Sequence, residues 1–170
     1  MIDAWQSRLL DDSGAARVAE SLRAAGLRLV LTNGVFDLLH AGHVEYLEAA
    51  RAAGDFLLVG LNSDTSVRRL KGPERPLVRE RDRARLLLAL RCVDGVVIFS
   101  EQTADALIEH VRPAVYVKGG DYVLSGSSDP GTLLPEEGAV RACGGEIRLI
   151  PFRPGYSTSG LVARLQGGSA

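Results

Sequence analysis

The sequence predicts an α/β fold in one doubly wound domain, with a five-stranded parallel sheet covered by helices on both faces. Short runs of Leu, Val and Ile are apolar throughout rather than alternating, which indicates strands buried on both sides. Segments with helical spacing separate these runs, and this alternation is typical of a parallel sheet with right-handed crossovers. Because ligands of such sheets bind beyond the carboxyl ends of the strands, functional residues are expected directly after strands.

Strand and helix signals alternate along the chain, with no internal repeat and no clear linker. A first helix is expected over residues 15–25, where apolar residues recur at helical spacing and Gly26 ends the run. Residues 1–26 are therefore interpreted as an N-terminal helical extension of a single domain whose core covers residues 27–166. The strands expected in the core are residues 27–31, 56–61, 95–99, 114–117 and 146–150. The helices expected between and after them are residues 43–53, 79–90, 103–111 (capped by Thr103), 136–142 and 158–165.

Two segments lack this regularity. Residues 64–78 are mixed and cationic and are expected to form a loop. Residues 119–135 are rich in Gly, Ser, Asp and Pro, and we interpret them as a mobile loop beside the functional site, with plain disorder as the alternative.

Composition limits the possible classes of protein. The chain is 46% hydrophobic and 24% charged with a formal net charge of −1, so no global basic field favours nucleic acid or an anionic membrane. Its apolar runs are too short to span a bilayer, and residues 1–10 lack the apolar region of a signal peptide. Cys92 and Cys143 have no zinc-binding spacing and are expected to be reduced, packed thiols. We therefore expect a soluble cytoplasmic protein.

The segment from Thr32 to His43 carries the most functional information. Gly34 follows the expected first strand and would let a ligand phosphate approach the backbone. His40 and His43 bracket Gly42 at the expected start of a helix, where free backbone N–H groups and the helix dipole favour anions. Two imidazoles three residues apart can face one phosphate from neighbouring directions. Two other roles stay open from the residues alone: helix capping and metal binding.

The run Thr-Asn-Gly-Val-Phe-Asp-Leu-Leu-His-Ala-Gly-His over residues 32–43 resembles the signature of the cytidylyltransferase-like nucleotidyltransferases. More closely, the chain is similar to the adenylyltransferase domains that make ADP-glycero-manno-heptose from heptose 1-phosphate. Further segments that carry the resemblance are residues 60–64, 69–72, 75–76, 82–84, 89–94, 117–122, 144–145 and 155–159, so it covers about residues 27–165. The resemblance implies a Rossmann-like fold and transfer of AMP from ATP to a sugar 1-phosphate, with Mg²⁺ as cofactor.

The resemblance also assigns roles to individual residues. It implies that His40, His43 and Lys71 are catalytic, as stabilisers of charge at the α-phosphorus and on pyrophosphate. It places the nucleotide against Thr32, Asn33, Gly34, Phe36, Asp37, Gly42, Lys118, Ser157, Thr158 and Ser159. It places the second substrate against Asn62, Asp64, Arg83, Gly119, Gly120 and Asp121. Mg²⁺ is expected to bind mainly through the triphosphate, because the sequence offers no certain metal ligands, although Asp37 is either a ligand or a turn cap.

Alternatives and partners complete the expectation. A CTP-dependent enzyme acting on a polyol or amino-alcohol phosphate, and a catalytically idle nucleotide-binding module, are the competing functions. A dehydrogenase is disfavoured because no Gly-x-Gly-x-x-Gly follows the first strand. The expected partners are ATP, a phosphorylated sugar, a separate sugar kinase and a second copy of the chain in a homodimer. The loop over residues 125–134 is long and rich in Ser, Pro and Gly, and it is the part of the chain that bears most on acceptor specificity.

Overall fold

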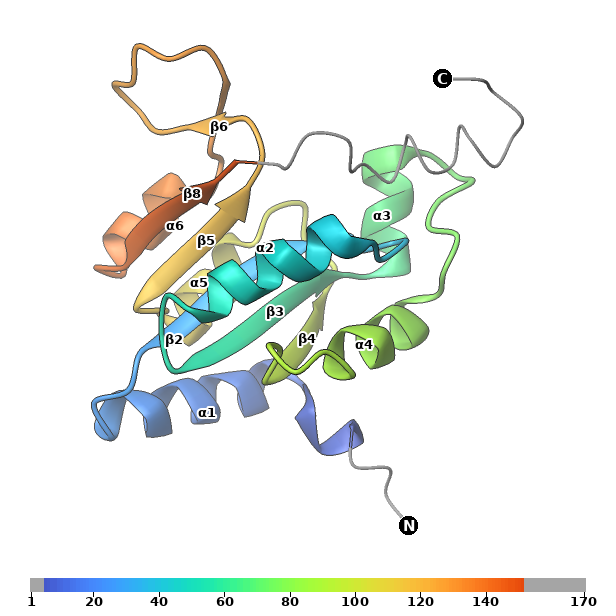
Figure 1. The fold of residues 1–170 in the computed structure, drawn as a ribbon, viewed down its shortest axis with the longest axis horizontal. Coiled ribbons are helices and arrows are strands. Elements are labelled where there is room, and N and C mark those ends of the chain that lie inside the picture. Colours follow the sequence, from blue (N-terminus) through green and yellow to red (C-terminus); the bar gives the residue numbers. More distant parts are fainter. Residues whose placement is uncertain (1–4, 152–170) are drawn as a thin grey trace.

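The computed structural model describes residues 5–151 (Figure 1). The strands are β1 (Leu9–Leu10), β2 (Leu29–Gly34), β3 (Phe56–Asn62), β4 (Gly95–Phe99), β5 (Val115–Gly119), β6 (Tyr122–Val123), β7 (Thr132–Leu133) and β8 (Glu146–Ile150). The helices are α1 (Asp12–Ala24), α2 (Ala41–Arg51), α3 (Asp64–Lys71), α4 (Glu80–Leu88), α5 (Asp105–Val111) and α6 (Glu137–Ala142), after a short 3-10 turn, η1 (Gln6–Arg8). The helix expected over residues 158–165 lies outside the described residues.

One parallel sheet organises the fold, in the order β1-β4-β3-β2-β5-β8. Its six strands correct the expected five. The additional strand lies in the segment interpreted as purely helical, where Leu9 and Leu10 pair with Val96 and Val97 of β4. Two residues are too short a run for apolar periodicity to reveal, because a pattern of period two needs at least about four residues.

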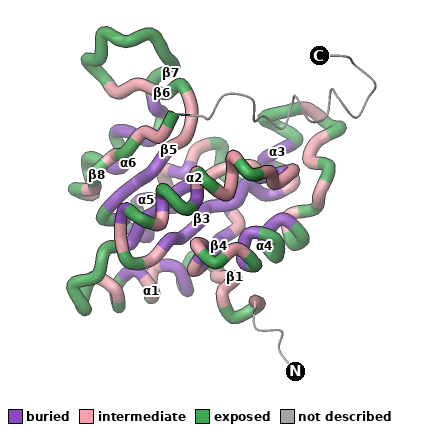
Figure 2. Tube along the Cα trace, viewed as in Figure 1, coloured by how far each residue is buried: buried purple, intermediate pink, exposed green. Residues whose placement is uncertain are grey.

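Helices cover both faces of the sheet (Figure 1). Val30 of β2 packs with residues of α2 and α4 on one face, whereas its neighbours Leu29 and Leu31 pack with α1 and α5 on the other. All three are buried, and Figure 2 shows the central strands as the most buried part of the molecule. The expectation of a parallel sheet covered on both faces is confirmed.

The ends of two strands differ from the expectation in a way that matters for the site. Strand β2 continues to Gly34 and β5 to Gly119, because their pairing with β3 and β8 continues to these residues. The polar residues Asn33 and Lys118 are therefore held inside strands rather than in the loops after them. Their positions are as rigid as the sheet itself.

Two segments expected to be irregular contain secondary structure. Residues 64–71 form helix α3, whose N-cap Ser63 accepts a hydrogen bond from the Ser66 backbone N–H. The loop over residues 119–135 contains the paired strands β6 and β7, and the turn between them is exposed (Figure 2). Helix α5 begins at Asp105 after Ala104, so Thr103 is not its cap.

Candidate active site

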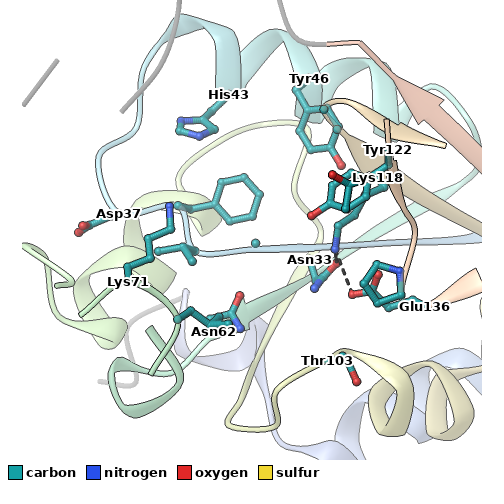
Figure 3. Close-up of a pocket in the computed structure, with 18 of the residues that line it drawn as sticks. Asn33, Asp37, His43, Tyr46, Asn62, Lys71, Thr103, Lys118, Tyr122 and Glu136 are labelled. Carbon is teal, nitrogen blue, oxygen red and sulfur yellow. Dashed lines mark hydrogen bonds and ion pairs between the residues drawn. The ribbon is translucent and has the colours of Figure 1, made fainter. Parts of the chain in front are cut away.

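A cavity of about 690 Å³ opens at the carboxyl ends of β2, β3 and β5 (Figure 3). Most of the residues expected in the site line it: Asn33, Gly34, Phe36, Asp37, His43, Asn62, Lys71, Lys118, Gly119, Gly120 and Asp121. The carboxyl ends of the parallel strands, where ligands of such sheets bind, thus bring together side chains that lie far apart in the sequence.

The two histidines occupy different positions at the start of α2. His40 is the N-cap, and its Nδ1 accepts a hydrogen bond from the His43 backbone N–H at 3.3 Å. Its ring stacks on that of His43 with 3.8 Å between centroids, but only His43 lines the cavity. Capping and phosphate binding are therefore compatible: His40 fixes the first turn of the helix and supports the ring of His43.

The electrostatics of this end of the cavity are cationic. Burial, with smaller contributions from His40 and Lys71, lowers the pKa of His43 to about 4. Burial also lowers the pKa of His40. His43 is therefore neutral at pH 7 before a ligand binds, and its imidazole carries one N–H that can donate to a phosphate oxygen. Lys71, the last residue of α3, adds a flexible ammonium group.

Gly34 lines the cavity, and its lack of a side chain also leaves room for the ring of Phe36. A Cβ built at Gly34 would lie 2.9 Å from Cε2 of Phe36, so the aromatic ring already occupies that space. Phe36 has a φ of 46°, a left-handed conformation that is costly for a bulky residue. Its ring also meets the edge of the His43 ring, with 5.4 Å between centroids. The ring of Phe36 thus packs between Gly34 and the ring of His43.

Asp37 anchors a loop. Its Oδ1 accepts hydrogen bonds from the backbone N–H groups of Leu77 (2.8 Å) and Val78 (3.0 Å), and its Oδ2 forms an ion pair with Arg75 (2.8 Å). Only 3% of the surface of Asp37 is exposed, so its carboxylate interacts mainly with these partners. The same contacts place Arg75 on the cavity wall, where it adds a cation that the sequence did not reveal.

The opposite end of the cavity holds a buried polar network. Nζ of Lys118 donates to Oδ1 of Asn33 (2.8 Å) and to Oε1 of Glu136 (3.1 Å). The Tyr116 hydroxyl donates to the same Asn33 oxygen at 2.6 Å. Burial lowers the pKa of Lys118 while the Glu136 carboxylate opposes that shift, and burial raises the pKa of Tyr116. The network fixes Asn33 with its oxygen turned toward two donors.

Tyr46 connects α2 to the sheet. Its hydroxyl shares a 2.6 Å hydrogen bond with Oγ1 of Thr32 and donates to the carbonyl of Val117 at 3.2 Å. Thr32 is fully buried and does not line the cavity, and its hydrogen bond to Tyr46 helps to position the helix that carries His43. Gly42, in the first turn of the same helix, also lies off the cavity wall.

Arg83 and Asp64, expected to contact the second substrate, do not line the cavity. Arg83 is fully buried, and its guanidinium donates to the carbonyls of Val78 (2.9 Å) and Val35 (2.6 Å) and to Oδ1 of Asp64 (2.8 Å). Asn62 does line the cavity, and its amide donates to Oγ of Ser66. Arg83 thus joins α4, α3 and the segment after β2 into one support for the site.

Several lining residues were not expected in the site: Tyr46, Arg75, Gln102, Thr103, Tyr122 and Glu136. Tyr46 follows His43 by one helical turn, so helical spacing could have found it. Gln102 and Thr103 follow β4, where the strand-end rule applies. The local sequence gave no indication that Glu136 lies in the site, because an acidic residue before a helix is explained equally well by its favourable interaction with the helix dipole.

Ser157, Thr158 and Ser159 lie outside the described residues, so their expected nucleotide contacts stay predictions. Over residues 5–151, Cys92 and Cys143 are free thiols, and no three His, Cys, Asp or Glu side chains cluster as a metal site. No helix in the same range is both long and apolar enough to cross a membrane.

Curated relatives match most of this chain. The bifunctional protein HldE of Geotalea uraniireducens is 51% identical over 154 residues, which cover 91% of this chain and 30% of that protein. HldE of Geobacter sulfurreducens is 49% identical over 150 residues, which cover 88% of this chain and 29% of that protein. The chain therefore spans about a third of the length of the curated relatives it matches.

Solved structures share the fold. The lipopolysaccharide core biosynthesis protein from Thermoplasma volcanium has a TM-score of 0.59 and 26% identity, covering 75% of this chain and 98% of that one. Pantoate-beta-alanine ligase from Francisella tularensis has a TM-score of 0.54 and 12% identity, covering 95% and 74%, which supports the fold alone. The family model described as cytidylyltransferase-like matches residues 31–163, from β2 through the cavity and beyond β8. The chain belongs to the cytidylyltransferase-like family.

Proposed function

We propose that the chain is an adenylyltransferase that transfers AMP from ATP to a sugar 1-phosphate, with glycero-manno-heptose 1-phosphate as the acceptor. The observation that carries this proposal is the neutral His43 imidazole beside Lys71 at the start of α2, within a cavity at the strand ends of a cytidylyltransferase-like chain. The heptose acceptor is supported by the segments at residues 60–64 and 117–122, and by the similarity to HldE proteins and to a lipopolysaccharide core biosynthesis protein.

The reaction is a single in-line displacement. An oxygen of the sugar phosphate attacks the α-phosphorus of ATP, a new P–O bond forms, and the bond to pyrophosphate breaks. The attacking oxygen is already an anion, so no strong general base is needed. The N–H of the His43 imidazole and the positive end of the α2 dipole would stabilise charge at the α-phosphate, while Lys71 and Arg75 would attract the β- and γ-phosphates. His40 acts through His43, as the cap that orients it.

Mg²⁺ fits this cavity as a companion of the triphosphate. Asp37 is bonded to Arg75 and two backbone N–H groups, whereas Asp121 is exposed at the cavity wall and would contact the ion or its waters. When bound, the ion would neutralise phosphate charge. Lys118, expected to contact the nucleotide, would contact a ligand only by sharing an ammonium already bonded to Asn33 and Glu136. The homodimer, the separate kinase and the cytoplasmic location stay predictions.

A direct test is a coupled pyrophosphate-release assay of the purified protein with ATP and heptose 1-phosphate, with the product identified by mass spectrometry. We expect stoichiometric pyrophosphate and ADP-heptose. Nucleotide binding without pyrophosphate release, with Mg²⁺ present and every acceptor tried, would instead identify an idle binding module.

A further inference from the structure

The cavity has two chemically different ends (Figure 3). His43 and Lys71 lie at one end, together with Arg75, and this end suits the phosphates of both substrates. Glu136 lies at the other end, beside Lys118, Asn33 and Tyr122 (Figure 3). A carboxylate paired with a lysine accepts hydrogen bonds but offers no net positive charge to phosphate, so the two ends select different parts of the ligands.

One carboxylate oxygen of Glu136 has no hydrogen-bond partner among the described residues. Only 3% of the residue is exposed, and Oε1 accepts the Lys118 hydrogen bond at 3.1 Å. Its second oxygen, Oε2, is buried and has no hydrogen-bond partner within residues 5–151. Burial and the nearby Glu136 carboxylate raise the pKa of Tyr116, and its hydroxyl donates its one proton to Asn33 at 2.6 Å. A buried carboxylate oxygen without a donor is costly, and such exceptions in folded proteins call for an explanation.

The charges around Glu136 indicate what kind of donor would satisfy it. Lys118 faces three acceptors, namely Asn33 at 2.8 Å, Glu136 at 3.1 Å and the Tyr116 hydroxyl at 3.4 Å. Its charge is therefore balanced inside the protein and is a weak attractant for a further anion. Thr103 adds a hydroxyl to the same cavity. This end is suited to a neutral group with several hydroxyls.

We propose that Glu136 determines acceptor specificity by accepting a hydrogen bond from a ring or side-chain hydroxyl of the acceptor sugar. The inference rests on the proposed function, because it assigns the sugar of the sugar 1-phosphate to this end of the cavity. The ribose of ATP offers the same hydroxyl chemistry. The phosphates of ATP and of the acceptor meet near His43, and Glu136 lies across the cavity from it (Figure 3). The test therefore separates the two hydroxyl sources.

The experiment compares wild type with Glu136→Gln, and uses Glu109→Gln as a control that removes one exposed carboxylate on α5 without touching the cavity. Steady-state constants are measured separately for ATP and for heptose 1-phosphate. We expect Glu136→Gln to lower kcat/KM for the sugar phosphate about 10- to 100-fold, mainly through KM, because a charged hydrogen bond is lost. The KM for ATP should change less than about 3-fold, and Glu109→Gln should match wild type.

Monodeoxy analogues give the second arm. At least one monodeoxy heptose 1-phosphate should be a poor substrate for wild type and lose little further in Glu136→Gln, because the two changes remove the same hydrogen bond. If Glu136→Gln does not fold, Glu136→Asp keeps the charge beside Lys118 but shortens the reach, and the same rise in sugar KM is expected.

Two results would overturn the inference in distinguishable ways. If wild type turns over heptose 1-phosphate and Glu136→Gln leaves its KM unchanged, or if the variant instead loses discrimination against 2′- or 3′-deoxy-ATP, Glu136 does not select the acceptor although the proposed function stands. If wild type releases no pyrophosphate with any sugar phosphate, the proposed function fails and the inference fails with it.

Discussion

His43 offers the sharpest single perturbation of the site. Its ring is held between the stacked ring of His40 and the edge of Phe36, and its pKa of about 4 keeps it neutral at pH 7. In the proposed reaction it would act as a preorganised N–H donor to the α-phosphate as charge develops there. Removing one such donor costs about 10²- to 10⁴-fold in turnover, or about 3 to 5 kcal/mol. We expect a loss of this size for His43→Ala.

Steady-state pyrophosphate release, together with calorimetric ATP binding, tests this expectation. Turnover should fall by the stated factor while ATP affinity changes much less, because the contact strengthens in the transition state. His110→Ala is the matched control, since His110 is exposed near the end of α5 and does not line the cavity. A His43→Ala protein that is folded and keeps more than about half of the wild-type turnover would refute the assignment of this residue.

Four further predictions follow from the same structure. Arg83→Met should lower the free energy of unfolding in urea by about 3 to 5 kcal/mol, because it leaves Asp64 and two carbonyls without their hydrogen-bond donor. Replacing the exposed Arg81 by Met should lower it by less than about 0.5 kcal/mol. Equal effects of the two variants would contradict the support role of Arg83. Activity removed by EDTA should return with Mg²⁺ alone; a requirement for stoichiometric zinc would contradict this. Between pH 4 and 6.5, His43 binds a proton in the unfolded chain but not in the folded protein, so the free energy of unfolding should rise with pH over this range. His43→Ala should reduce the slope of the free energy of unfolding against pH. An unchanged slope would count against the effect of burial on the His43 pKa. Hydrogen exchange over residues 125–131 should be fast without substrates and slower with them; equal, strong protection would exclude a mobile loop.

The sheet was predictable because its signals are local. Strands β4 and β8 have the bounds that their apolar runs predict, and the expected elements of residues 27–150 occur in the expected order, with α3, β6 and β7 added in the two segments expected to be irregular. What the sequence did not reveal depends on pairing partners. Leu9 and Leu10 form a strand only because β4 lies beside them, and β2 extends to Gly34 because β3 pairs with it.

The candidate site was predictable where residue type and strand ends coincide. His43, Asn33, Lys118 and Asp121 line the cavity as expected. Residues that the sequence could not place make contacts between distant segments. Arg83 was expected to contact the second substrate, but its partners lie 5, 19 and 48 residues away and bury it completely.

Glu136 and Arg75 reach the cavity for the same kind of reason. Glu136 lies beside Lys118 because the chain between them folds back through β6 and β7. Arg75 is held at the cavity by its ion pair with Asp37, which lies far from it in the sequence. Neither contact can be predicted from the spacing of residues in the sequence.

Nucleotide and acceptor preference tests the central claim most directly. Purified protein is given ATP or CTP, each with heptose 1-phosphate, glycerol 3-phosphate or choline phosphate, and kcat/KM is measured for every pair. Because a site that hydrogen-bonds several hydroxyls rejects analogues lacking them, ATP with heptose 1-phosphate should exceed the CTP pairs by at least about 100-fold, about 3 kcal/mol of discrimination. A preference for CTP with a non-sugar phosphate would contradict the heptose adenylyltransferase assignment.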